Sequence, residues 1–398
     1  MPPAQASFVQ PGKPADLAAE LAERFEQLTG HGPAAVAAAP GRVNLIGEHL
    51  DYNGGRCLPI ALPHATYAAL GRREDRTLTL TSRQMSGPVE IPFYDLRPGS
   101  VEGWGAYVAG VVWALGQEGW EVPGLDVVVD SRVPIGSGLS SSAALECAVA
   151  VALAAALDVP DSAEVRRRLA ESCVRAEAEM AGAPTGGMDQ TVALFGRAGH
   201  ALLLDFADGS ARQLSWSPDD EDLALLVVDT RVSHTLTDGG YASRRSDCES
   251  AARALGVETL REAQGRVDAL EQLSEPRLRR RTRHVLAEMD RVDAAVHALE
   301  RADHAALGPL LDASHDSLRD DFEVSCPELD LVVETCRRRG ALGARMTGAG
   351  FGGSAIALLR ADDLEDVALA VTTAFEEKGW RPPGLLRSPA SDGARRLR

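Results

Sequence analysis

This sequence predicts an α+β protein of two domains, and three observations lead to that prediction. The chain has 398 residues, of which 45% are hydrophobic and 25% charged, and this is long for a single hydrophobic core. Runs with strand spacing and runs with helix spacing follow one another without the regular alternation of a parallel α/β sheet. An acidic turn that contains proline, at 218–222, follows a predicted strand. We therefore expect domains of residues 1–206 and 207–398.

The spacing of apolar residues predicts the elements in chain order. In the first half we expect helices at 16–28, 104–115, 145–157 and 164–180, and strands at 35–39, 67–72, 77–82, 89–93 and 125–129. In the second half we expect strands at 200–206, 223–230 and 355–359, and helices at 241–255, 278–299, 304–318, 329–338 and 364–375.

Composition excludes several classes of partner. The net charge of -17 disfavours nucleic acids and anionic membrane surfaces as partners, because they would be repelled. A cluster of arginines at helical spacing, at 277–283, is interpreted as a solvated helix face. No apolar stretch has the length of a membrane span, and the N-terminus lacks the pattern of a signal peptide. The six cysteines form neither a CxxC pair nor a metal-ligand cluster, so we expect free thiols in the cytoplasm.

A glycine- and serine-rich stretch, 134–144, follows a predicted strand and leads into an alanine-rich helix. Its glycines allow backbone N–H groups to approach a ligand, and the positive end of the helix dipole points into the turn. This arrangement is typical of an anion site, and we expect nucleotide phosphates to bind there. An ordinary strand-to-helix connection is the alternative.

Two further blocks are rich in glycine. In 40–55, Arg42, Glu48, His49 and Asp51 stand within ten residues, and they could form a polar cup whose carboxylates accept hydrogen bonds from sugar hydroxyls. A salt-bridged surface loop is the alternative. The block at 346–354 precedes a strand and suggests a loop pressed against a ligand or another backbone, with a tight hairpin as the alternative.

Asp189 follows a stretch, 181–187, whose proline and three glycines exclude a simple helix. It could cap the next helix, which is a common stabilising role for aspartate. It could also serve as a base in a reaction.

Together, PGRVNLIGEHLDYNGG, PIGSGLSSSAALECAVA and MTGAGFGGSAIAL resemble, in order and spacing, the three signature motifs of the GHMP small-molecule kinase superfamily. The first resembles the galactokinase signature, and GGMDQ and DTRVSHTLTDGGYASRR extend this resemblance over essentially the whole chain. Leu50 departs from the pattern, since galactokinases usually have threonine there. The resemblance implies an N-terminal α+β domain with a left-handed βαβ unit, a C-terminal α+β domain, and an active site in the cleft between them.

The resemblance also implies roles for individual residues. Asp189 matches the catalytic aspartate and Arg42 its cationic neighbour. Sugar contacts are implied for Glu48, His49, Asp51, Gly186 and Tyr241. Nucleotide contacts are implied for Gly136, Ser137, Gly138, Leu139, Ser140, Ser141 and Ser142. Ser142 and Glu177 match the positions that hold Mg²⁺.

The implied activity is ATP-dependent phosphorylation of D-galactose at its anomeric hydroxyl, by a monomer or weak homodimer. Phosphoryl transfer needs neutralised phosphates, an aligned acceptor oxygen and a carboxylate to take its proton, and these residues can supply each. The only lysines, Lys13 and Lys378, lie outside any Walker or protein-kinase motif, which excludes those kinase sites. The alternatives are a kinase for N-acetylgalactosamine or arabinose, and a sugar sensor without catalytic activity.

Overall fold

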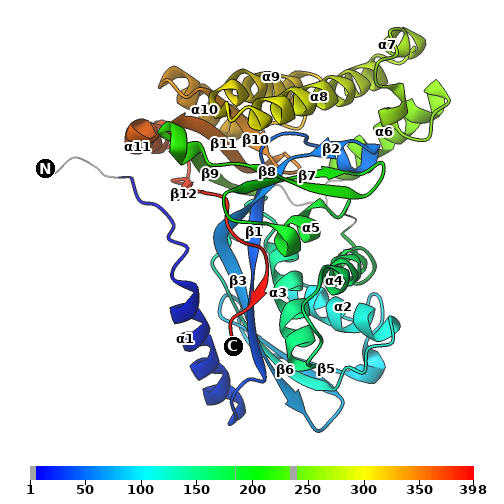
Figure 1. The fold of residues 1–398 in the computed structure, drawn as a ribbon, viewed down its shortest axis with the longest axis vertical. Helices are drawn as coiled ribbons and strands as arrows, with labels where there is room; N and C mark the ends of the chain where they lie inside the picture. The colour runs from blue at the N-terminus through cyan, green and yellow to red at the C-terminus, as the bar shows by residue number, and fades with distance from the viewer. Residues whose placement is uncertain (1–5, 184, 234–239) are drawn as a thin grey trace, which may run out of the picture.

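The computed structural model describes residues 6–183, 185–233 and 240–398, and within these residues three β-sheets are flanked by helices (Figure 1). The largest sheet has the strand order β13-β1-β3-β6-β4-β5. Its strands are β1 (Ala35–Asn44), β3 (Pro59–Arg73), β4 (Thr77–Ser82), β5 (Val89–Pro92), β6 (Gly124–Ser131) and β13 (Arg395–Arg396). Neighbours are antiparallel except β4 and β6, which run parallel.

Helices cover both faces of this sheet. They are α1 (Pro14–Thr29), α2 (Trp104–Gln117), α3 (Ser141–Ala156), α4 (Ala163–Arg175) and α5 (Met188–Phe195). Side chains alternate along β1, so that Val36 and Ala38 pack with α1, while Ala37 and Ala39 belong to the core formed by α2, α3 and α4. Because both faces of the sheet are buried, β1 is apolar over most of its length.

The C-terminal half contains a four-stranded sheet with the order β10-β11-β9-β12. Its strands are β9 (Leu223–Ser233), β10 (Gly343–Thr347), β11 (Gly352–Arg360) and β12 (Gly384–Arg387). The helices of this half are α6 (Gly240–Leu255), α7 (Ala269–Gln272), α8 (Pro276–Glu300), α9 (Leu307–Asp320), α10 (Pro327–Arg338) and α11 (Leu364–Glu377). In Figure 1, α8, α9 and α10 form a layer at the top of the view.

A three-stranded sheet, β2-β7-β8, begins directly after the glycine-rich block at 40–55. Its strands are β2 (Arg56–Cys57), β7 (His200–Asp205) and β8 (Ser210–Ser215). The 3₁₀ turns are η1 (Asp51–Asn53), η2 (Phe93–Asp95), η4 (Pro218–Glu221), η6 (Leu260–Ala263), η7 (His304–Ala306) and η8 (Ala361–Asp363), and η3 (Ala176–Met180) is a π-helical turn.

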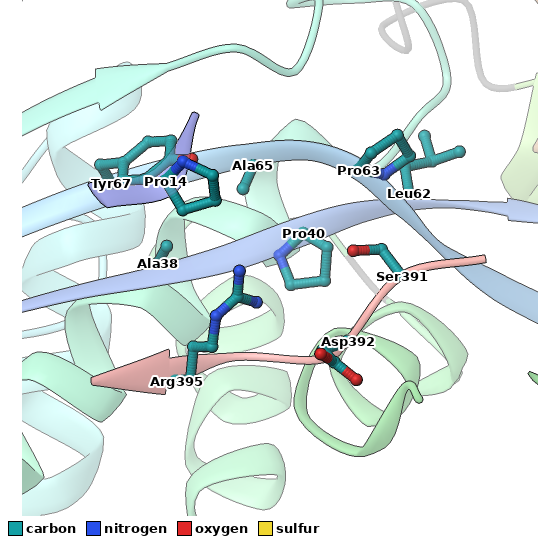
Figure 2. Close-up of a pocket in the computed structure, with 10 residues that line it drawn as sticks. All are labelled: Pro14, Ala38, Pro40, Leu62, Pro63, Ala65, Tyr67, Ser391, Asp392 and Arg395. Carbon is teal, nitrogen blue, oxygen red and sulfur yellow. The ribbon is translucent and has the colours of Figure 1, made fainter. Parts of the chain in front are cut away.

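The C-terminal segment returns to the N-terminal half, where β13 pairs with β1. Figure 2 shows Asp392 and Arg395 of this segment beside Pro40 of β1, around a cavity of about 10 Å³. That volume holds no more than one water molecule, so this cavity is not a substrate site. The division at residue 206 stays a prediction. The tail that follows β12 comes after that division in the sequence but packs against the N-terminal half.

Most predicted elements are present, with differences at their ends. β1 continues to Asn44, because an irregularity between Pro40 and Arg42 lets the ladder with β3 pass the proline. The interpretation of 277–283 as a fully solvated face is wrong at Arg281, whose side chain is 2% exposed. No helix in the described ranges combines the length and apolarity needed to cross a membrane.

Candidate active site

β1 carries Arg42 to the place where the three glycine-rich motifs meet. A Cβ at Gly41 would lie 2.6 Å from the Leu139 carbonyl oxygen, so glycine is required for this approach of β1 to the turn before α3. The Arg42 N–H donates to the same oxygen at 3.1 Å, and its Nη1 donates to the Gly138 carbonyl at 2.7 Å. Arg42 is therefore fixed by backbone that belongs to the second motif.

Arg42 and Asp189 form a bidentate ion pair. Nε donates to Oδ1 at 2.7 Å and Nη2 donates to Oδ2 at 2.9 Å, which is the fork geometry that favours arginine over lysine. The Ser140 hydroxyl also donates to Oδ2, at 2.5 Å. The alternative that Asp189 caps α5 is wrong, because Gly187 is the N-cap and the Asp189 carboxylate is directed to Arg42 and Ser140.

The turn at 134–142, here named the phosphate loop, leads into the N-terminus of α3. Ser140 adopts a left-handed conformation with φ of 57°, which is uncommon for a residue other than glycine. Ser137 is buried, and its hydroxyl donates to the Pro134 carbonyl at 2.7 Å. The Leu139 side chain is buried in the hydrophobic core, so only its backbone is available for the predicted nucleotide contact. Gly136, Gly138, Ser141 and Ser142 are half-buried or exposed.

Asp51 and Gly186 are in direct contact. Asp51 begins η1, and a Cβ on Gly186 would lie 2.1 Å from its Oδ2 atom, so any other residue at 186 would displace the Asp51 side chain. The pKa of the Asp51 carboxyl is raised to about 6, mainly by burial and in addition by the charges of Asp189 and Glu48. Burial also raises the pKa of the Tyr241 hydroxyl, and the Asp51 charge acts in the same direction. Gly186, Asp51 and Tyr241 thus lie close together.

His49 lies in an aromatic cluster beside that space. Its φ is 63°, its Nδ1 is 2.9 Å from the Tyr52 hydroxyl, and its ring centroid is 5.8 Å from that of Tyr241 and 4.7 Å from that of Phe322. Burial, followed by the His284 charge, lowers the pKa of His49 to about 3, so the ring is neutral at physiological pH. Tyr52 was not among the predicted residues, although it stands within the first motif.

Glu48 is 2% exposed, and its carboxylate receives hydrogen bonds from the protein itself. Oε1 accepts from the Gly348 N–H at 2.7 Å and lies 3.0 Å from the Thr347 hydroxyl, while Oε2 accepts from Asn44 Nδ2 at 2.9 Å. Glu48 therefore joins the first motif to the third. Its predicted contact with a sugar stays a prediction.

Glu177 lies on the π-helical turn η3, next to Ser142. The pKa of its carboxyl is raised to about 7, because burial and then the Asp189 charge outweigh the opposing hydrogen bonds from Ser142 and Gln190. Gln190 Nε2 donates to Glu177 Oε2 at 2.5 Å and to Oε2 of the buried Glu146 at 3.1 Å. A divalent cation bound beside this carboxyl and the Ser142 hydroxyl would stabilise the ionised form of the carboxyl, which burial disfavours. The pair Ser142 and Glu177 thus fits Mg²⁺ that is also held by nucleotide phosphates.

Family models match three parts of the chain. A galactokinase galactose-binding signature matches residues 23–72, the N-terminal domain of GHMP kinases matches 106–197, and the C-terminal domain of GHMP kinases matches 295–377.

Curated relatives span nearly the whole chain. A galactokinase of Streptomyces coelicolor is 50% identical over 96% of this chain and 99% of its own length, and a galactokinase of Bos taurus is 41% identical over 96% and 97%. The structure of a Lactococcus lactis galactokinase complexed with galactose superposes with a TM-score of 0.88 at 30% identity, covering 95% of this chain and 99% of that one. A Methanococcus jannaschii mevalonate kinase, with a TM-score of 0.65 at 16% identity over 90% and 98%, shares the fold. The chain belongs to the galactokinase family of the GHMP kinases.

Proposed function

We propose that Asp189 and Arg42 carry the reaction of this galactokinase, in which ATP phosphorylates the anomeric hydroxyl of D-galactose to give α-D-galactose 1-phosphate and ADP. The observation that supports this assignment is the bidentate pair of Arg42, from the first motif, with Asp189, from α5, which also bonds to Ser140 of the phosphate loop. An arrangement of this kind can align an acceptor hydroxyl with a phosphoryl group and take up its proton.

Asp189 has room for one more hydrogen bond. A carboxylate offers about four acceptor positions, and three are taken by Arg42 Nε, Arg42 Nη2 and the Ser140 hydroxyl. The anomeric hydroxyl would donate to the fourth and pass its proton to Asp189 as its oxygen attacks phosphorus. Arg42 keeps its charge throughout and would stabilise the negative charge that develops on that oxygen.

The remaining sugar hydroxyls would be recognised around Asp51. Its carboxylate would accept from two ring hydroxyls, with Gly186 leaving the necessary space and Tyr241 and His49 forming the wall. Glu48 would act at the far edge of this space, with its charge already shared with the third motif.

The nucleotide phosphates would lie on the phosphate loop, where Gly136, Ser137, Gly138, Leu139, Ser140 and Ser141 offer backbone N–H groups or hydroxyls at the N-terminus of α3. Ser142 and Glu177 would hold Mg²⁺ together with phosphate oxygens. When bound, the metal supplies positive charge that lowers the repulsion between the phosphates and the attacking oxygen.

We further propose domains of 1–206 and 207–398, with the C-terminal tail returning to the first, and a cytoplasmic monomer or weak homodimer with no nucleic-acid or membrane partner. All six cysteines are free thiols in the part of the chain that the structure describes, and this supports a reducing compartment.

A coupled assay of ADP release over a panel of free sugars tests the proposal. Galactose should give the highest kcat/KM, above N-acetylgalactosamine and arabinose. A higher value for either of those sugars would reassign the substrate. Galactose binding without ADP release from any sugar would indicate a sensor.

A further inference from the structure

Arg345 is a fully buried charge that the proposed reaction does not use. Its side chain, on β10 directly before the third motif, is 0% exposed. Nη1 donates to the Asn44 carbonyl at 3.1 Å and to the Leu45 carbonyl at 2.9 Å, and Nη2 lies 3.5 Å from Glu48 Oε1. Burying a guanidinium is costly unless its partners compensate. Here the partners all lie in residues 44–51 of the first motif, named the sugar loop.

Other groups of the C-terminal half hold the same loop. Glu288 of α8 accepts from the Gly47 N–H at 2.9 Å, and the Thr347 hydroxyl accepts from the Asn44 N–H at 3.2 Å. His284 Nε2 lies 3.3 Å from the Glu48 carbonyl. The backbone of the sugar loop is thus oriented by polar groups that come from α8 and β10.

The third motif also contacts the phosphate loop. The Ser354 hydroxyl donates to the Ser137 carbonyl at 2.7 Å, and a Cβ at Gly348 would lie 3.1 Å from the Gly138 carbonyl oxygen. One short segment therefore touches both proposed substrate loops, but Arg345 bonds only to the sugar loop.

We propose that Arg345 is a positioning residue for galactose. It fixes the position of the sugar loop, so that Asp51 and Arg42 can contact the same substrate molecule. The inference rests on the proposed sugar site. Because the guanidinium reaches two consecutive carbonyls and the Glu48 carboxylate at once, a lysine could keep the charge but not all three contacts. The sugar loop would then relax, while the phosphate loop would keep its contact with Ser354.

The test compares Arg345→Lys with Arg281→Lys. Arg281 is also buried, and its Nη2 bonds to Glu323 at 2.6 Å and its Nη1 to the Asp321 carbonyl at 2.5 Å. Among the residues that the structure describes, it makes no hydrogen bond to the sugar loop and approaches it only through the Phe322 ring, which packs on His49. Both variants should lose thermal stability. Only Arg345→Lys should raise the KM for galactose, by about tenfold or more, with the KM for ATP within about twofold of wild type. Calorimetry should show the same loss of galactose affinity without nucleotide.

Thr347→Val serves as a milder variant if Arg345→Lys does not fold, because it removes one hydroxyl beside Glu48 with little change of shape. It should raise the galactose KM selectively, by about threefold or more. An unchanged galactose KM in the folded variants, an equal rise of both KM values, or the same rise in Arg281→Lys would overturn the inference. Asp51→Ala distinguishes a failure of the proposed sugar site from a failure of the proposed role of Arg345. If it leaves galactose use unchanged, the proposed sugar site is wrong, whereas an effect of Asp51→Ala without one of Arg345→Lys rejects only the role of Arg345.

Discussion

Replacing Asp189 with asparagine removes the proposed base and keeps the size of the side chain. The amide can accept from Arg42 at one atom only. Its NH₂ group would face another donor in either orientation, which is Arg42 Nε at the Oδ1 position, or both Arg42 Nη2 and the Ser140 hydroxyl at the Oδ2 position. The carboxylate that could take the sugar proton is lost. A general base contributes about 10²- to 10⁴-fold in rate, so the activation free energy should rise by about 3–5 kcal/mol.

Stability should also fall, for a reason unrelated to helix capping. The Arg42 side chain is 7% exposed and would lose its counter-charge, whereas Asp189 is 20% exposed and partly screened by solvent. We expect a loss of about 1–3 kcal/mol in the free energy of unfolding. Asp126→Asn is a matched control, because Asp126 accepts from Arg73 Nη1 at 2.8 Å near the far end of β6, away from the phosphate loop.

Single-turnover phosphorylation with excess enzyme measures the chemical step directly, and calorimetry gives the dissociation constants for galactose and ATP. In Asp189→Asn the single-turnover rate should collapse while both ligands still bind. In Asp126→Asn only the melting temperature should fall. A single-turnover rate of Asp189→Asn within about tenfold of wild type would refute the general-base role and leave Asp189 as the partner that orients Arg42.

The other site residues give three further predictions. Ionised Asp51 should accept the sugar hydroxyls, so kcat/KM for galactose should fall as the pH drops through about 6, where the pKa of Asp51 lies. The sign for stability is opposite, because the native state holds this proton more tightly than the unfolded chain with its pKa of 3.8, and the galactose-free protein should gain stability as the pH falls from about 6 towards 3.8. If kcat/KM instead fell only near pH 4, the pKa of Asp51 would not be raised, and both statements would be contradicted. Glu177→Gln should raise the Mg²⁺ concentration for half-maximal rate and weaken Mn²⁺ binding measured by electron paramagnetic resonance, and wild-type metal dependence would return Glu177 to an ordinary buried acid. Gly186→Ala should raise the galactose KM by displacing the Asp51 carboxylate, with thermal melts as the check on folding, and an unchanged KM would show that Asp51 can move freely.

Local patterns in the sequence predicted most helices and the long strands, because their apolar residues repeat at the period of the element. They did not predict five of the shorter strands, β2, β8, β10, β12 and β13. Of these, β2 and β13 are only two residues long and pair with strands distant in the chain. Nor could composition place Arg345. A lone arginine before a glycine-rich stretch has no periodic signal, and its burial depends on carbonyls some three hundred residues earlier.

The site residues were predicted by the resemblance more than by their chemistry. Taken alone, Asp189 is equally suited to cap a helix, and only the contact with Arg42 decides against that role. For Glu48, residue type alone is misleading in the opposite direction, because a glutamate in this motif suggests a carboxylate that is free to accept hydrogen bonds from a sugar. In the structure its carboxylate already accepts three hydrogen bonds from the protein, two from the third motif and one from Asn44 of the first.

Each of the three motifs contains one residue other than glycine in a left-handed conformation: His49 at φ 63°, Ser140 at 57° and Phe351 at 60°. Such a conformation costs on the order of 1 kcal/mol or more for an ordinary side chain. Glycine would remove this cost, and glycines are frequent around all three positions. The side chains explain why glycine is absent: Ser140 bonds to Asp189, His49 packs on Tyr241, and the Phe351 ring packs so closely on Gly240 that a Cβ there would lie 2.7 Å away. Gly240 begins the helix that carries Tyr241. We infer that these side-chain contacts maintain the strained backbone in all three motifs, and that they hold the proposed catalytic carboxylate and the wall of the proposed sugar site in fixed positions before either substrate binds.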